Sequence, residues 1–242
     1  MFRREAHRRA LAVLAALDGE LLERTATLFA GGTRLVLEFD EYRESEDLDF
    51  LCADAAGYAE VRSLARRAGP AALFAPGRAG IEFPREARAD QYGVRFPVTV
   101  EGRRIKLEVV REARVALAPG VRPAWSPVPC LALVDCYAQK LLANSDRWAD
   151  QNVLSRDLID LGLLRVRAGA IPPEAWAKAE GVYRGAVRDD LVKAVRWFLD
   201  REDRRGRCLG ALGVDRPAEI LAGVEALGAD LTLAAEGEEI GL

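Results

Sequence analysis

Two carboxylates spaced two residues apart, Asp47 and Asp49, are the strongest chemical signal in the chain. On a strand they would point to one face, where both could reach a single hard cation. Mg²⁺ prefers oxygen ligands and usually keeps positions for water and substrate phosphates. Upstream, the Gly31-Gly32-Thr33 turn offers phosphates a backbone without side-chain bulk and a hydroxyl group. Together these features favour metal-assisted nucleotidyl transfer.

Each feature taken alone has an ordinary structural interpretation. The two glycines fit a helix C-cap that follows the apolar residues Leu28 and Phe29. Asp47 and Asp49 would suit a solvated turn. The order of the features argues against both interpretations. We expect one strand over 34–39 directly after the glycines and a second strand over 48–52 at the acids.

In this order the residues resemble the nucleotidyltransferase fold, and in particular the AbiEii/AbiGii toxin family of bacterial nucleotidyltransferases. Three later segments are similar to parts of the same family. Residues 105–110 resemble its third-carboxylate strand, 135–143 its lysine helix, and 155–161 its late segment with two acids. The resemblance covers about residues 25–165.

The resemblance implies an α+β fold, in which a mixed β-sheet with flanking helices is followed by a C-terminal α-helical bundle. A proline-rich connector over 118–129 marks the expected boundary. We therefore expect a nucleotidyltransferase-fold domain over 1–127 and a helical domain over 128–242 that contributes to the active-site cleft.

Periodicity predicts the other elements. One or two amphipathic helices fill the first thirty residues, interrupted near Asp18-Gly19, and a β-hairpin over 92–110 turns at Glu101-Gly102. Further helices are expected at 58–67, 131–143, 153–164, 174–183, 191–199 and 217–227. An arginine-dense stretch over 193–207 is better explained as a solvated helix face than as a phosphate-binding surface.

The candidate chemistry needs carboxylates to hold two metal ions, Mg²⁺ or Mn²⁺. We assign Asp47 and Asp49 to both ions, and Glu108 completes one site or acts as the base. Glu108 is one methylene longer than the Asp of the family pattern, and Lys106 shares its strand face. The residues predicted to bind the NTP are Gly31, Gly32, Thr33, Ser45, Lys106 and Asp160.

Lys140 is a further catalytic candidate, because only four of the 35 basic residues are lysines and this one lies in an apolar helix. A lysine supplies a compact point charge that can neutralise phosphates. A snorkelling helix lysine is the competing interpretation. Asp157 or Asp160 could orient Lys140 or the nucleotide, and the resemblance favours Asp157 as the catalytic residue.

Composition narrows the class of protein. Half of the 242 residues are apolar, which predicts a substantial core. No apolar run is long enough to span a membrane, and the first residues do not resemble a cleaved signal. The four scattered cysteines suit buried free thiols. We therefore expect a cytoplasmic protein. The single histidine, His7, is expected on a helix surface, which argues against histidine triads and zinc sites. The net charge of −3 argues against a protein that coats nucleic acid.

The resemblance also implies a biological role, the toxin of a toxin–antitoxin pair with a cognate antitoxin. Some family members transfer nucleotides to RNA such as tRNA ends, and others are known only to bind nucleotide. Our leading hypothesis is transfer of NMP from an NTP to RNA. The alternatives are a nucleotidyltransferase that modifies a protein or small molecule, and a non-catalytic nucleotide-binding interaction protein.

Overall fold

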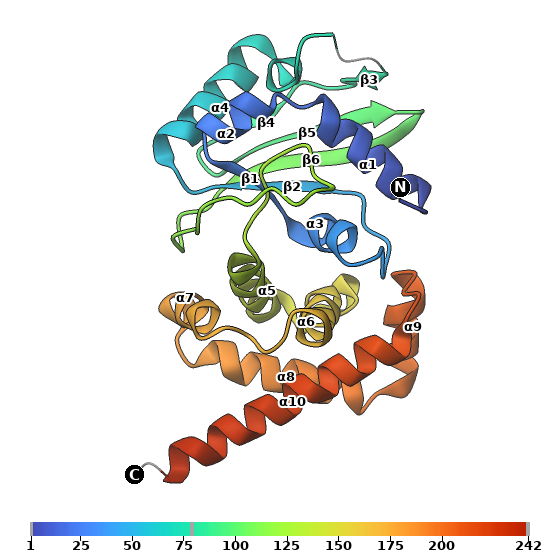
Figure 1. Cartoon of the computed structure of the whole chain (residues 1–242), viewed down its shortest axis with the longest axis vertical. Coiled ribbons are helices and arrows are strands. Elements are labelled where there is room, and N and C mark those ends of the chain that lie inside the picture. Colours follow the sequence, from blue (N-terminus) through green and yellow to red (C-terminus); the bar gives the residue numbers. More distant parts are fainter. Residues whose placement is uncertain (1, 78–79, 241–242) are drawn as a thin grey trace. The chain divides into compact units, whose positions relative to one another are not determined.

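The chain has an α+β fold with a mixed sheet and a helical C-terminal region, as the resemblance implied (Figure 1). The computed structural model describes residues 2–77 and 80–240, with side chains up to 233. It divides into two compact units, Met1–Ala132 and Leu133–Leu242. Each unit is described below by itself.

The first unit contains the sheet, whose strands run in the order β1-β2-β6-β5-β3, with β4 also paired to β5. Strands β2 and β6 are parallel and the other pairs are antiparallel. The strands are β1 Thr27–Ala30, β2 Leu48–Cys52, β3 Ile81–Glu82, β4 Arg88–Ala89, β5 Gly93–Val100 and β6 Arg103–Arg111.

The predicted hairpin is confirmed. β5 and β6 are joined by Glu101 and Gly102, which have φ values of +50° and +71°. Two consecutive residues with positive φ match the twist of the flanking strands. Ile105, Leu107 and their neighbours on one face are buried, as the alternation predicted.

Helices cover this sheet on both sides. In Figure 1, α1, α2 and α4 lie on one face and α3 lies on the other. Their bounds are α1 Glu5–Ala16, α2 Gly19–Arg24, α3 Gly31–Glu38 and α4 Ala55–Ala68, with a short 3-10 turn at Pro70–Leu73. The predicted break near Asp18-Gly19 is confirmed, because the Asp18 carboxylate accepts the N–H of Leu21 at 3.0 Å and starts α2.

The strand predicted over 34–39 is wrong, because residues 34–38 belong to helix α3 and Phe39 is its C-cap. The C-cap interpretation of the glycines is also wrong, since Gly31 follows strand β1 and begins the helix. Consecutive apolar residues Leu35, Val36 and Leu37 are all buried. A short apolar run of this kind fits either a strand or a buried helix, so periodicity could not decide.

His7 is not on the surface as predicted but fully buried, with Nδ1 2.9 Å from Oε1 of Glu41. The same carboxylate accepts the backbone N–H groups of Arg3 and Arg4 at the start of α1. Burial lowers the pKa of His7 more than the contact with Glu41 raises it. The histidine is therefore part of an N-terminal capping arrangement.

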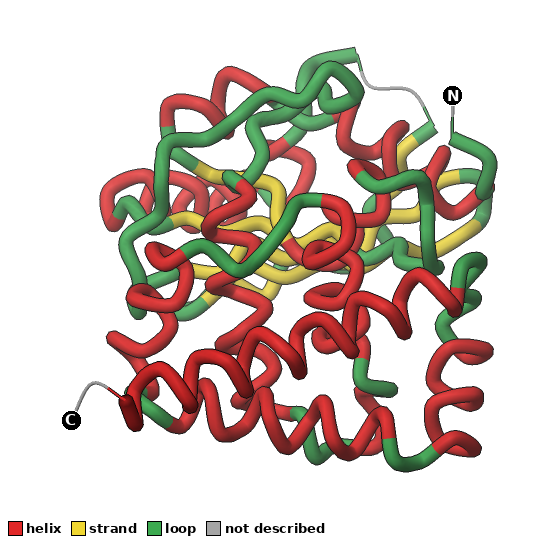
Figure 2. Tube along the Cα trace, turned by 60° about the horizontal axis from the view of Figure 1, so that its bottom comes forward, coloured by secondary structure: helices red, strands yellow, loops and turns green. Residues whose placement is uncertain are grey.

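The second unit is built from helices, as predicted, and Figure 2 shows helices and connecting loops throughout its described residues. They are α5 Leu133–Arg147, α6 Arg156–Arg167, α7 Pro173–Tyr183, α8 Ala186–Leu199, α9 Glu202–Ala211 and α10 Pro217–Ile240, with a 3-10 turn at Gln151–Val153. Helices α6 and α10 cross closely, because a Cβ on Gly223 would overlap the carbonyl of Gly162.

The arginine-dense stretch forms two helices, α8 and α9, rather than one solvated face. Arg204 is only 7 % exposed, and its guanidinium lies 3.7 Å from the ring centroid of Trp197. Trp197 in turn packs edge-on against Trp148 at 5.7 Å. Packing within the second unit therefore explains these tryptophans.

The cysteines and the apolar content of the helices can be compared with the expectations from composition. Cys52, Cys130, Cys136 and Cys208 are buried free thiols, as predicted. Within the described part of the chain, no helix combines the length and apolar character needed to cross a bilayer.

Candidate active site

The N-terminus of α3 forms the first part of the candidate site. Strand β1 ends at Ala30, and Gly31, with φ +73°, turns the chain directly into the helix. The first backbone N–H groups of a helix have no partner inside it, and the helix dipole adds partial positive charge there. A phosphate group suits such a helix end.

Both glycines of this turn have close neighbours that leave no room for a side chain. A Cβ on Gly31 would lie 2.6 Å from Oδ2 of Asp49, and a Cβ on Gly32 would overlap the guanidinium of Arg43. Arg43 is 3 % exposed, and its Nη1 donates to the carbonyl of Glu44 at 2.8 Å. Arg43 is absent from the predicted site residues, although it adjoins the glycine turn.

The hydroxyl of Thr33 connects the turn to the acidic segment. Its Oγ1 lies 2.9 Å from Oγ of Ser45 and donates to the carbonyl of Asp47 at 2.5 Å. Because Thr33 has a single hydroxyl hydrogen, Ser45 is the donor in the first of these bonds. Thr33 is 1 % exposed, so its hydroxyl fixes the segment that carries Asp47 against α3.

The three candidate carboxylates lie on neighbouring parts of one sheet face. Asp47 is exposed and directly precedes β2, while Asp49 lies within β2 and is half-buried. Asp49 pairs in register with Glu108 on the parallel strand β6, so their side chains leave the same face. The opposite face at this point carries buried Leu48 and Phe50.

The donor set fits a divalent metal at two of the three carboxylates. Within residues 2–77 and 80–240, no three His, Cys, Asp or Glu side chains form a group that could hold a metal ion. Glu108 pairs instead with Lys106, Nζ to Oε2 at 2.5 Å, and with Nε of Arg95. Asp47 and Asp49 supply the one or two carboxylates that Mg²⁺ usually takes from a protein.

The charges of this cluster are coupled. Burial would raise the pKa of Glu108, but hydrogen bonds and positive charge from Lys106 and Arg95 lower it. Burial would lower the pKa of Lys106, but Glu108, with smaller contributions from Asp49 and Asp47, raises it. Glu108 and Lys106 are therefore ionised together at neutral pH.

The remaining candidates lie in the second unit, where α5 meets α6. Lys140 Nζ bridges Oδ1 of Asp157 at 2.9 Å and Oδ2 of Asp160 at 2.6 Å. Arg147, which is not among the predicted residues, binds Asp157 through Nε at 2.7 Å and Nη2 at 3.0 Å. Burial would raise the pKa of Asp157, but the charges and hydrogen bonds of Lys140 and Arg147 hold it far below its usual range. Both acids therefore form ion pairs with Lys140, and the catalytic roles of the three residues stay predictions.

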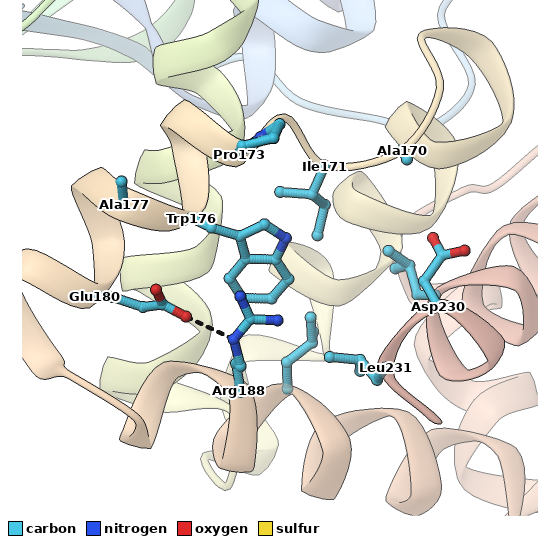
Figure 3. Close-up of a pocket in the computed structure, with 11 residues that line it drawn as sticks. Ala170, Ile171, Pro173, Trp176, Ala177, Glu180, Arg188, Asp230 and Leu231 are labelled. Atoms are coloured by element: carbon cyan, nitrogen blue, oxygen red, sulfur yellow. Dashed lines mark hydrogen bonds and ion pairs between the residues drawn. The ribbon is translucent and has the colours of Figure 1, made fainter. Parts of the chain in front are cut away.

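The second unit also contains a cavity of about 330 Å³, shown in Figure 3. Arg188 stacks on the ring of Trp176 at 4.3 Å from its centroid and donates to Glu180 at 2.6 Å. Asp230 at its edge binds Arg165. None of the predicted site residues lines this cavity, and each of its three charged groups has an ion-pair partner.

Comparison with known proteins identifies a family and a shared fold. The family model described as "Nucleotidyl transferase AbiEii toxin, Type IV TA system" matches residues 13–207. The crystal structure of JHP933 from Helicobacter pylori is 16% identical, covers 99% of both chains and has a TM-score of 0.56. A second Helicobacter pylori structure, whose description proposes a nucleotidyltransferase, is 18% identical, covers 94% of this chain and 96% of its own, and has a TM-score of 0.52. At such identities the likeness shows the fold. A search among curated proteins gives no match.

Proposed function

The chain belongs to the AbiEii nucleotidyl transferase toxin family of type IV toxin–antitoxin systems, and from this premise we propose that it transfers NMP from an NTP to a hydroxyl group of RNA. The family supports a nucleotidyltransferase with a nucleotide substrate and an antitoxin partner. The RNA acceptor, the metal and the cytoplasmic site of action belong to the proposal.

One observation carries the chemistry: the glycine turn and the acids are built as a single unit. Asp49 fills the space left by the missing side chain of Gly31, and Thr33 holds the backbone of Asp47. A triphosphate at the start of α3 would therefore lie beside both carboxylates. Nucleotidyl transfer needs this juxtaposition, because the reacting phosphate must meet anion donors and metal ligands at one place.

Nucleotidyltransferases in general use a divalent metal, and Asp47 and Asp49 would hold it here, with Mg²⁺ or Mn²⁺ as the candidates. When bound, such ions stabilise the attacking and leaving oxygens of an in-line displacement. Glu108 would complete one site or accept the proton of the attacking hydroxyl. Either role requires Glu108 to part from Lys106 and Arg95.

The cationic side chains near the acids would then bind the phosphates of the NTP. Lys106 is 51% exposed and could turn from Glu108 to a phosphate oxygen. Gly31 and Gly32 would donate backbone N–H groups, and Ser45 adjoins them. In the second unit, Asp157 and Asp160 would keep Lys140 charged and oriented so that it neutralises charge on the leaving pyrophosphate.

Radiolabelled NTPs incubated with total cellular RNA and protein test the proposal most directly. We expect Mg²⁺- or Mn²⁺-dependent label on RNA with wild type, and at least a roughly hundredfold loss with Asp49→Asn, which removes a metal-holding charge but keeps the side-chain shape. Glu20→Gln, a change at an exposed acid of α2, is the matched control and should label RNA like wild type.

Other outcomes separate the alternatives. Label on protein or on a small alcohol would replace RNA as the acceptor while keeping the reaction. Calorimetric binding of an NTP without any labelled product would favour the nucleotide-binding interaction protein. NTP affinity that needs no metal and survives loss of both Asp47 and Asp49 would contradict the assigned site.

A further inference from the structure

The sheet face that carries Asp49 and Glu108 continues into a row of basic residues. Strand register places Asp49 beside Glu108, Glu108 beside Arg95, and Arg95 beside Arg88 on β4. Along β6, Lys106 and Arg104 alternate with buried residues and so share the face of Glu108. We call the set Arg88, Arg95, Arg104 and Lys106 the basic face.

The basic face is open to solvent. Lys106 is 51% and Arg95 is 37% exposed, and Arg88 and Arg104 are exposed as well. The other face of the same strands is filled by the core, including Phe96, which is 3 % exposed. The side chains of the basic face therefore project away from the core.

Part of this positive charge is not neutralised by the protein. Lys106 and Arg95 pair with Glu108, and Arg95 also lies 3.6 Å from Asp90. No ion pair joins Arg88 or Arg104 to any of the residues that the structure describes. An exposed acid, Glu82, lies opposite Thr99, and Thr99 lies opposite Arg104, so Glu82 is two strands away from Arg104.

The positions of these charges suit a chain of phosphates. Neighbouring strands lie about 4.8 Å apart and residues along a strand rise about 3.3 Å each, which places Arg88 and Arg104 on the order of 10 to 13 Å from Glu108. An aromatic side chain, Tyr92, is 66% exposed in the turn that precedes β5. Basic side chains that follow a backbone, together with an exposed aromatic ring, are the usual means of binding single-stranded nucleic acid.

We infer that the basic face binds the phosphodiester backbone of the acceptor RNA and leads its reacting hydroxyl to Asp47 and Asp49. The inference rests on the proposed nucleotidyl transfer to RNA, but it concerns a binding surface outside the metal-holding residues. Contacts to phosphates position a nucleic acid without reading its sequence. The surface should therefore bind RNA with little sequence preference and with strong dependence on salt.

A double variant, Arg88→Ala with Arg104→Ala, tests the surface without touching the assigned catalytic residues. Its matched control is Arg66→Ala with Arg67→Ala, two exposed arginines at the end of α4, the helix on the other side of the sheet. Binding of a fluorescein-labelled single-stranded RNA is followed by anisotropy over a series of salt concentrations. Thermal unfolding and calorimetric NTP binding are measured for each protein.

We expect the double variant to bind the RNA at least about tenfold more weakly than wild type, with unchanged NTP affinity and melting temperature. Each lost phosphate contact should reduce the slope of log K against log salt by about 0.7. The control pair should match wild type. Equal RNA affinity and equal salt slope for all three proteins would overturn the inference, as would an absence of RNA binding by wild type.

The two proposals fail in different ways. Labelled RNA from the double variant at the wild-type rate and affinity would leave nucleotidyl transfer to RNA standing and remove the basic face as its binding surface. RNA binding that depends on Arg88 and Arg104, without label transfer to RNA by wild type, would support the surface and contradict the proposed acceptor reaction.

Discussion

At the scale of single residues, the guanidinium of Arg43 fills the space that a side chain at position 32 would occupy. The missing Cβ of Gly32 is what admits the guanidinium of Arg43 and the hydroxyl of Ser45, whose Oγ would lie 3.3 Å from that Cβ. Arg43 is buried among these groups. The turn proposed to bind the triphosphate therefore depends on a glycine for packing as well as for backbone approach.

Gly32→Ala should consequently impair both folding and nucleotide binding. Displacing the guanidinium in a packed site is expected to lower the free energy of unfolding by about 1 to 3 kcal/mol. NTP affinity should fall at least about tenfold, or 1.4 kcal/mol. Denaturant unfolding and calorimetry measure the two effects.

Gly206→Ala is the matched control, because it makes the same change inside helix α9, where the new Cβ has no atom within 4 Å apart from the chain neighbours and the backbone of its own helix. It should be neutral or stabilising by up to about 1 kcal/mol. Wild-type nucleotide affinity in Gly32→Ala would show that the turn does not bind the triphosphate.

Of the site residues that were not predicted, the sequence contains enough information to find Arg95 but not Arg43. The two-residue turn at Glu101-Gly102 fixes the hairpin register, and counting outward from it places Arg95 opposite Glu108. The position of Arg43 follows from the chain folding back on α3 through Asp40 and Glu41, both with φ +56°. Residue periodicity does not encode such a turn by non-glycine residues.

At the scale of elements, the contact between α5 and α6 is organised by a buried charge cluster. Lys140 is shared by Asp157 and Asp160, and Arg147 supplies a second cation to Asp157. The three-residue spacing placed Asp157 and Asp160 on one helix face and left Lys140 as one of the groups that they could orient, whereas Arg147 was not predicted. Helix α3, in contrast, was predicted as a strand, because a short buried element has no hydrophobic periodicity that distinguishes a helix from a strand.

Lys140 should be needed for both stability and turnover, and two substitutions separate the roles. Lys140→Ala leaves two buried carboxylates short of a cation and should lower the free energy of unfolding by about 3 to 5 kcal/mol. Lys140→Arg keeps a charge and should retain more of that stability, yet turnover should fall nearly as far, because a planar fork replaces a compact ammonium.

A double-mutant cycle checks the structural part of this prediction. Adding Asp160→Asn to Lys140→Ala removes one of the stranded charges and should restore part of the lost stability, giving a coupling energy above about 1 kcal/mol. Additive effects would mean that Lys140 and Asp160 are not coupled. Full turnover by Lys140→Arg would show that the compact ammonium has no catalytic role.

Tyr137 provides a pH test of the same pair of helices. Its single hydroxyl hydrogen is shared between the carbonyls of Leu164 and Gly169, each 2.9 Å from the hydroxyl oxygen. Burial raises the pKa of Tyr137 to about 12, above its ordinary value of about 10. A raised folded-state pKa means that the neutral hydroxyl contributes stability below pH 10, and that this contribution is lost as the pH rises through about 12.

Tyr137→Phe should therefore be less stable than wild type by about 1 to 3 kcal/mol at neutral pH. The difference between the two proteins should shrink between about pH 10 and 12. Denaturant unfolding at a series of alkaline pH values measures it. A difference that stays constant over this range would mean that the hydroxyl titrates alike in the folded and unfolded states.

At the scale of the whole molecule, family membership supports a biological role as a toxin, which the site geometry alone does not support. The acids, the glycine turn and the basic face support nucleotidyl transfer to a polyanionic acceptor, whereas damage to the producing cell is supported by the family. The overall charge of −3 gives no sign of nucleic-acid binding. Only the strand register shows that Arg88 and Arg104 lie on the same face of the sheet as Glu108.

Induced expression should slow growth of the host cell if the chain acts as a toxin through its assigned site. Asp49→Ala shortens a half-buried side chain without adding bulk, so the fold should persist, and growth should return to that of an empty vector. Immunoblots confirm equal protein levels, and Glu20→Ala at an exposed acid of α2 should remain toxic. Equal arrest by wild type and Asp49→Ala would attribute the harm to binding or aggregation instead of catalysis. Normal growth with wild type would indicate an enzyme whose acceptor the cell can spare, and would favour a protein or small molecule over RNA.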